Sequence, residues 1–269
     1  PLPFAPGGRE WALANLTKGE IDIAADISLS APGNDIAETR VDRLVGLLGY
    51  RDLKVRYMPH MPELNDVTGT ARYEAGLLHF DVSAGHSVGL RISGTTIELD
   101  RLDQPAGQRA AIRMNIGGTA PEVIRFLARP QLGLSKDVLY DYRRLGGDVS
   151  VDVALGFPLV AALSVADLEL AADATLTNFS LKDAIGQVGL AEATARVKYA
   201  GSELSVSGTG KLDGNPVEIG WREMFGAKPP FRRRYELKGV VPAPLVAKAG
   251  FTPVEPFVTG PIGTTVSYQ

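Results

Sequence analysis

The sequence lacks cysteine altogether, and its 269 residues include only three histidines, His60, His79 and His86. The absence of cysteine excludes disulfide scaffolds, thiolate-bound zinc, iron–sulfur clusters and thiol nucleophiles. It also suits an oxidising compartment, where free thiols are a liability. The three histidines do not have the spacing of metal ligands, so we expect neither a metal site nor a bound cofactor.

Excess positive charge and long apolar runs are missing too. Lys and Arg number 28 against 31 Asp and Glu, which gives a net charge of −3. The electrostatic signature of a nucleic-acid-binding protein is therefore absent, and we expect no such partner. No apolar run reaches the roughly 18 residues of a membrane-spanning helix, and no signal peptide is recognisable. Because the chain begins at Pro1 and not at Met, we expect it to be an internal piece of a longer protein.

The strongest positive feature is the alternation of apolar and polar residues. Within 19–30, for example, Ile21, Ile23, Ile27 and Leu29 are separated by Asp, Ala and Ser. A period of two is typical of a strand with one apolar and one polar face. It predicts about a dozen strands separated by Gly and Asx turns, as at 74–76 and 213–215. The clearest strands cover 19–30, 148–155, 167–178 and 192–199, and weaker ones cover 77–82, 90–102, 110–116, 204–212, 217–221, 235–240 and 264–268.

Helical patterns are few. Thr119 and Glu122 have the spacing of a capping box, which predicts a short helix through Ala128 that ends before Pro130. A second short helix is predicted over 242–249, and a third over 36–48. Segment 135–142 is ambiguous.

Parts of the chain repeat at an offset of about 110–125 residues. A strand, a short helix beginning near a proline and a glycine-bearing strand follow one another around Pro121 and again around Pro242. Self-similarity of this kind is typical of arrays of stacked units. We expect residues 1–269 to form one continuous segment with internal repeat units at about 64–146 and 190–269.

One stretch matches a motif of serine hydrolases. Gly85, Ser87 and Gly89 fit the G-x-S-x-G nucleophile elbow, which needs a helix after the serine. The residues that follow, 90–97, have the pattern of a strand. We therefore favour a glycine-rich turn between two strands, and we expect no catalytic residue and no enzymatic activity.

A single basic run stands at 232–234, with Lys228 and Lys238 nearby. It is either a contact for a lipid head group or an acidic partner, or simply the solvated end of a strand.

The predicted helices are too few to cover the apolar stripes of a dozen strands. The stripes must face each other, as in a sandwich or barrel, or face something outside this sequence. An aliphatic lining suits acyl chains and an ordinary packed core equally well, so the pattern alone leaves both interpretations open.

Three segments of the chain share a pattern of prolines, glycines and aromatic residues with a known protein family. The first begins "YRDLKVRYMPHMPELNDVTGTARYEAGLLHFDVSAG", and the later ones are "GGDVSVDVALGFPL" and "VEIGWREMF". The matching positions are Pro62, Leu64, Gly69, Arg72, Tyr73, Gly147, Gly156, Phe157, Pro158, Leu159, Trp221, Arg222 and Glu223. With these positions, most of 51–269 resembles the YhdP/AsmA-like (TamB-related) family of bacterial envelope proteins.

The resemblance implies an all-β fold, in which an elongated, curled antiparallel sheet forms a repeating β-groove with two or three short crossing helices. It implies a non-enzymatic periplasmic conduit that carries phospholipid acyl chains between the inner and outer membranes and takes part in outer-membrane biogenesis. It also implies an inner-membrane anchor outside this segment. An envelope scaffold or interaction protein with a closed β-sandwich core is the alternative.

In the conduit hypothesis, the apolar phase of the strands lines the lipid path. The expected lining residues are Ile21, Ile23, Ile27, Leu29, Leu78, Phe80, Val82, Ile112, Met114, Ile116, Val149, Val151, Val153, Leu155, Leu168, Leu170, Val197, Leu204, Val206, Val217 and Ile219.

Overall fold

The fold was analysed in a computed structural model. It describes residues 6–31, 33, 39–132, 141–160, 162–164, 167–225, 232–250 and 261–268, with the backbone alone for 6–9 and 261–268. Residues 135–140 of the ambiguous segment 135–142 lie outside the described residues.

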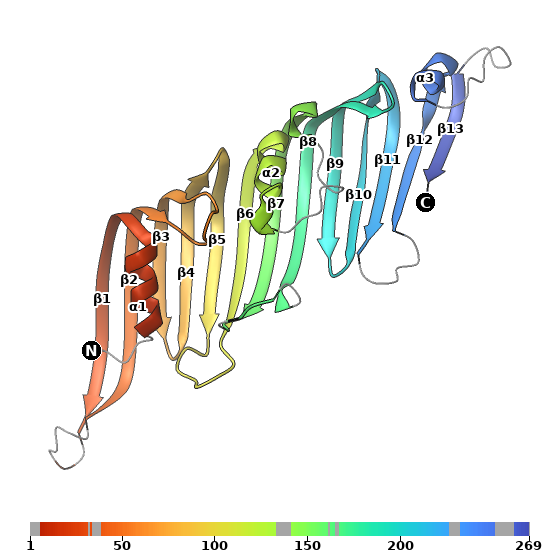
Figure 1. The fold of residues 1–269 in the computed structure, drawn as a ribbon. Coiled ribbons are helices and arrows are strands. Elements are labelled where there is room, and N and C mark those ends of the chain that lie inside the picture. Colours follow the sequence, from red (N-terminus) through yellow and green to blue (C-terminus); the bar gives the residue numbers. More distant parts are fainter. Residues whose placement is uncertain are drawn as a thin grey trace. The chain divides into compact units, whose positions relative to one another are not determined.

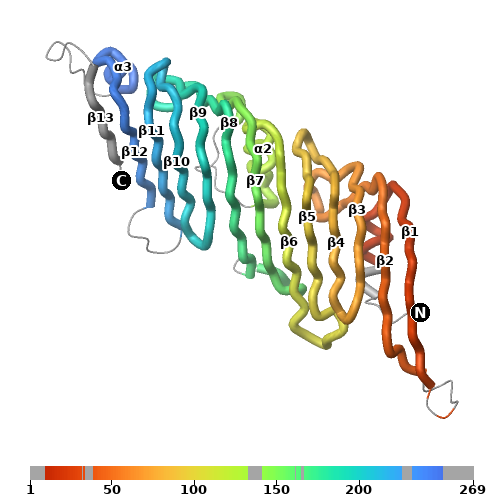
Figure 2. The backbone as a smooth tube through the Cα atoms, turned by 180° about the vertical axis from the view of Figure 1, so that it is seen from behind, coloured from red at the N-terminus to blue at the C-terminus, as the bar shows by residue number. Residues whose placement is uncertain are grey.

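The described chain forms antiparallel strands that pair in chain order, from β1 to β13 (Figures 1 and 2). Each inner strand is hydrogen-bonded to the strands that precede and follow it in the sequence, so β1 and β13 each have one neighbour. The predicted all-β fold, an antiparallel sheet with a few short helices, is confirmed. The strands are β1 Leu16–Ser30, β2 Arg40–Val55, β3 Leu64–Glu74, β4 Leu77–Ser87, β5 Leu90–Asp100, β6 Arg109–Thr119, β7 Leu145–Pro158, β8 Glu169–Ile185, β9 Val188–Ala200, β10 Glu203–Leu212, β11 Asn215–Met224, β12 Arg233–Pro242 and β13 Pro261–Tyr268.

The chain divides into two compact units. Unit 1 comprises Pro1–Ile116 and Val153–Glu169, and unit 2 comprises Gly117–Asp152 and Leu170–Gln269. Strands β6 and β7 each contribute residues to both units. The two units are described separately below.

Tight turns join several pairs of neighbouring strands, among them the two predicted at 74–76 and 213–215. Ala75 and Gly76 connect β3 to β4 with φ of 48° and 78°, and Asp213 and Gly214 connect β10 to β11 with φ of 43° and 88°. Two consecutive positive φ values define the turn whose twist matches that of a hairpin, and glycine adopts them without a steric penalty.

Two of the three predicted helices are present. The first, α2 (Ala120–Leu127), follows Thr119, whose backbone N–H and hydroxyl both donate to Oε2 of Glu122, at 3.0 and 2.8 Å. The second, α3 (Ala243–Lys248), follows Pro242. Two 3₁₀ turns, Pro130–Leu132 and Tyr142–Arg144, flank the segment after α2.

The helix predicted over 36–48 is wrong, because β2 occupies 40–55. Val41, Leu44, Val45 and Leu48 have helical spacing, and this pattern favoured a helix. In the sheet, Leu44 and Leu48 lie opposite Ile27 and Ile23 of β1, and Val45 faces the other side. Strand pairing thus overrode the local pattern. Neither β3 nor the helix α1 (Pro6–Asn15), which overlaps β2 and β3 in the view of Figure 1, was among the predicted elements.

The core of unit 1 centres on Tyr50, which is 6% exposed. Gly69 lies directly opposite Tyr50 in the β2–β3 register. The ring packs over this glycine, and the phenol donates a hydrogen bond to the backbone carbonyl of Asp81 at 3.2 Å. A Cβ atom built on Gly69 would lie 2.0 Å from that carbonyl oxygen and 2.6 Å from the phenol oxygen. The missing side chain therefore lets the ring cross the sheet surface.

We expect Gly69→Ala to lower the free energy of unfolding by about 1–3 kcal/mol, since the methyl group collides with backbone and must displace the ring. Gly49→Ala on the neighbouring strand is the matched control, because a Cβ at Gly49 meets nothing within 4 Å. Urea denaturation of both variants measures the difference. Equal stability of the two variants would contradict the packing described here.

Candidate functional site

In unit 1 the apolar residues of successive strands lie side by side. Directly paired residues of an antiparallel sheet point to the same face, and the register from β1 to β5 is therefore enough to define the faces. We call the apolar one the unit 1 face. One row across it consists of Ile23, Leu48, Ala71, Phe80 and Ile97.

The neighbouring rows continue the same face. Ile21 lies opposite Tyr50 and Ile27 opposite Leu44, and Val82 and Leu78 follow on β4. Six expected lining residues therefore share this face: Ile21, Ile23, Ile27, Leu78, Phe80 and Val82. Leu29 lies beyond a register shift, opposite Val41.

The unit 1 face is open toward β1. Ile21, Ile23 and Ile27 are 43%, 71% and 42% exposed, whereas Tyr50 and Ala71 in mid-sheet are buried. Exposed aliphatic residues scattered singly need no explanation, but several on one strand face form a contiguous apolar surface. This surface is a candidate binding site for an apolar ligand.

The opposite face of unit 1 is charged. Arg43 pairs with Asp26 at 3.0 Å and with Glu74 at 3.5 Å, and Arg51 pairs with Glu20 at 3.0 Å. These ion pairs are exposed and each contributes little to stability. Their importance is in the contrast: within unit 1 one sheet face is charged and the other is apolar.

Unit 2 repeats this two-sided pattern over β8 to β12. Its apolar surface, the unit 2 face, includes the row Ala174, Val197, Val206, Trp221 and Tyr235. On the other side Arg196 pairs with Asp173 at 2.6 Å. The expected lining residues on the unit 2 face are Val149, Val151, Leu170, Val197, Leu204, Val206, Val217 and Ile219.

Two helices cover parts of the unit 2 face. Ala120 of α2 packs with Val149 and Ala174, and Leu245 of α3 packs with Val188 and other residues near the ends of β9 to β12. Lys248 of α3 forms an ion pair with Asp213, which lies in the turn between β10 and β11. The helices therefore close some of this face, and Leu170 remains 43% exposed.

The remaining expected lining residues lie in unit 1 beyond the strands whose register is described. Ile112, Met114 and Ile116 alternate along β6 and are half-buried, as are Val153 and Leu155 at the end of β7. Leu168 precedes β8 and is 37% exposed.

A charged pair interrupts the unit 2 face. Glu223 follows Val217, Ile219 and Trp221 in phase along β11, lies opposite Leu204 and Arg233, and is 6% exposed. Nε of Arg233 donates to Oε1 of Glu223 at 2.8 Å. Of the predicted basic run, Arg233 is thus held by a buried carboxylate and is not a solvated strand end.

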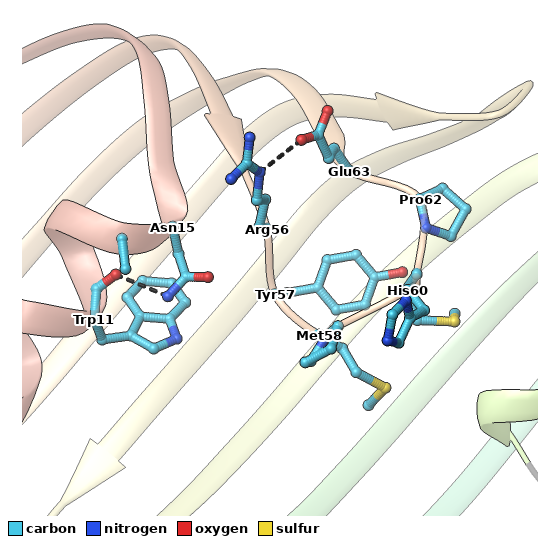
Figure 3. Close-up of a pocket in the computed structure, with 11 residues that line it drawn as sticks. Trp11, Asn15, Arg56, Tyr57, Met58, His60, Pro62 and Glu63 are labelled. Atoms are coloured by element: carbon cyan, nitrogen blue, oxygen red, sulfur yellow. Dashed lines mark hydrogen bonds and ion pairs between the residues drawn. The ribbon is translucent and has the colours of Figure 1, made fainter.

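A pocket of about 770 Å³ opens beside α1 in unit 1 (Figure 3). Trp11 of α1 and the loop after β2 line it, with Tyr57, Met58 and His60 on the loop. Glu63 closes the loop by accepting a hydrogen bond from Arg56 at 2.8 Å. The hydrogen bonds from Lys54 and Arg56 lower the pKa of Glu63 below its usual value. The pocket is largely apolar with a charged rim.

The motif around Ser87 forms a hairpin turn. Ser87 ends β4, Leu90 begins β5, and Val88 and Gly89 between them have φ of 43° and 88°. Ser87 is 2% exposed, and its hydroxyl has no hydrogen-bond partner among the described residues. The predicted glycine-rich turn between two strands is present at this position.

The histidines lie apart from one another. His79 lies 3.3 Å from Asp81 and 3.2 Å from Glu98, and His86 lies 3.6 Å from Asp66, all at the surface. Within the described ranges no three His, Asp or Glu residues gather closely enough to hold a metal ion. Those ranges likewise include no helix with the length and apolarity needed to cross a membrane.

Comparison of the chain with models of protein families, with curated proteins and with solved structures finds no match.

Two parts of the candidate site were not predicted from the sequence. The loop 56–63 contains Pro59 and Pro62 but no motif of a binding site, and its pocket depends on α1, which has no clear amphipathic pattern. Glu223 did carry a signal, because it continues the period-two phase of Val217, Ile219 and Trp221. Extending the predicted strand 217–221 by two residues would have placed a carboxylate on the apolar face.

The burial of Tyr50 makes the stability of unit 1 depend on pH. Burial, together with the nearby charge of Asp81, raises the pKa of the phenol to about 12, against about 10 in an unfolded chain. The folded state therefore favours the neutral phenol, and this stabilisation is complete below pH 10 and is lost as the pH rises from about 10 through about 12.

We expect the wild type to lose more unfolding free energy than Tyr50→Phe between about pH 10 and 12, because phenylalanine has no proton to release. Denaturation curves from pH 7 upward measure the difference between the two proteins. If that difference stays constant above pH 10, the phenol is not held neutral by the fold.

Proposed function

We propose that this chain is a non-enzymatic conduit for the acyl chains of phospholipids. The observation that carries the proposal is the unit 1 face, a contiguous apolar surface that no described helix covers at β1. Ile23, on the edge strand β1, is 71% exposed. Leaving such a surface in water is unfavourable by about 25 cal/mol per Å², and an acyl chain would remove it from water without needing a directional contact.

The size of the face supports this ligand. Five strands spaced about 4.8 Å apart span roughly 19 Å, and the acyl chains of one leaflet span about 15 Å, half of the hydrocarbon core. Because aliphatic contacts are non-directional, a chain held on this face can slide. The charged opposite face suits contact with water.

The resemblance of the sequence to envelope proteins sets the context of the proposal. We place the conduit in the periplasm, as part of a protein anchored in the inner membrane through a segment outside this chain. Its ligand would be a phospholipid or another lipid with acyl chains.

The second candidate is an envelope scaffold whose apolar faces are covered by protein. The burial of Val188 and Val217 against Leu245 of α3 favours it for one end of unit 2, where the fold already closes the apolar face with its own helix. The exposed residues of β1 favour the conduit.

The experiment places a charge on the unit 1 face. In Ile23→Lys, the new ammonium group reaches water from an exposed site, so the fold should survive, but lipid capture should fall about tenfold. Ala24→Lys adds the same charge one residue away on the opposite face and should bind lipid like the wild type. Crosslinking to photoreactive phospholipid, with thermal melting as the folding control, measures both.

Leu170→Lys and Ala171→Lys form an equivalent pair on β8 of unit 2. If the wild type crosslinks no lipid, or if both members of a pair lose lipid equally, the conduit is excluded. Unfolding of Ile23→Lys together with a wild type free of lipid would favour the packed scaffold.

A further inference from the structure

We propose that Glu223 on the unit 2 face binds the primary ammonium group of a phospholipid head group, of the kind found in phosphatidylethanolamine. This inference rests on the proposed function, since it assigns the head-group contact of a ligand whose acyl chains lie on the apolar face.

Glu223 lies where the apolar rows of the unit 2 face end, which is where the head group of a lipid would follow its acyl chains. The unit 2 face runs from α3, which packs on Val217, through Ile219 and Trp221 to Glu223 at the end of β11. An amphiphile lying on the half-buried Ile219 and Trp221, with its tail pointing toward the end that α3 covers, would present its polar end to the carboxylate.

The carboxylate has capacity for one more donor. Oε1 accepts from Arg233, whereas Oε2 is buried and accepts no hydrogen bond from the described residues. A buried carboxylate oxygen without a donor is unfavourable. A ligand that brings an N–H group, and above all a charged one, would satisfy it with a strong hydrogen bond.

The neighbouring cation completes the match to a zwitterionic head group. In such a lipid the phosphodiester lies two carbon atoms from the ammonium nitrogen, so its negative charge approaches the site together with the positive one. The guanidinium of Arg233 lies beside Glu223, with the side chain 36% exposed. The protein therefore presents a negative and a positive charge side by side in one row of the sheet, as partners for the ammonium group and the phosphodiester of one head group.

Aromatic rings flank the pair. Trp221 stacks on Tyr235 with ring centroids 5.7 Å apart, and Tyr199 meets Phe225 edge to face at 6.0 Å. Amphipathic aromatic rings commonly lie where apolar and polar surroundings meet. They form the transition from the aliphatic rows to the charged pair.

The experiment compares lipids in which methyl groups replace the N–H donors of the ammonium group one at a time, while its positive charge is kept. Vesicles carry one acyl-labelled lipid each: phosphatidylethanolamine, its N-methyl and N,N-dimethyl derivatives, or phosphatidylcholine, which has none. We expect the wild type to capture phosphatidylethanolamine about tenfold better than phosphatidylcholine, the range of one charge-assisted hydrogen bond, with intermediate values for the others. The series uses the wild type alone and does not depend on the folding of a variant.

Glu223→Gln removes the charge and keeps the shape, so it should lower capture of phosphatidylethanolamine to the level of phosphatidylcholine. Glu218→Gln, on the same strand but the opposite face, should behave like the wild type. Equal capture of all four lipids by the wild type, or a preference that persists in Glu223→Gln, overturns this proposal and leaves the conduit standing. Capture of none of them overturns both.

Discussion

Hydrogen bonding between strands that are neighbours in the chain is the constraint on which the rest of the structure depends. Each strand pairs only with the strands before and after it, so side-chain alternation along one strand is carried to the next by the register. A row such as Ile23, Leu48, Ala71, Phe80 and Ile97 results directly from this pairing. Within each unit, one face is consequently apolar and the other charged.

This arrangement leaves the apolar faces with little to cover them. A sandwich buries the apolar side of one sheet against another, but the described strands belong to one sheet, and α2 and α3 contact only parts of the unit 2 face. The buried clusters are correspondingly small, and in unit 1 the cluster around Tyr50 is buried whereas the apolar residues of β1 are exposed. A surface that is incompletely buried in this way is available to a ligand, which is the physical basis of the lipid proposal.

The two units have the same two-sided sheet, but the residues on their apolar faces differ. At the edge strand β1, the exposed residues of the unit 1 face are aliphatic. Unit 1 also contains a pocket of about 770 Å³ beside α1. The unit 2 face instead ends in aromatic rings and the pair formed by Glu223 and Arg233. Non-directional contacts suit a chain that slides, whereas a buried charge pair is directional and suits a head group that must be distinguished.

The sequence by itself determined the fold class, most strands, the tight turns and the helix after Thr119, because these depend on local properties: alternation, glycine at positive φ, and a side chain that caps a helix three residues away. It also showed that helices are too few to cover the strands. Only the tertiary structure decided that 40–55 is a strand, since Leu44 and Leu48 gain their partners from β1, a non-local contact. The same holds for the ring of Tyr50 over Gly69 and for the pairing of Glu223 with Arg233. Each of these contacts joins residues from different strands. The register between the strands brings the residues together, and the alternation within a single strand does not determine that register.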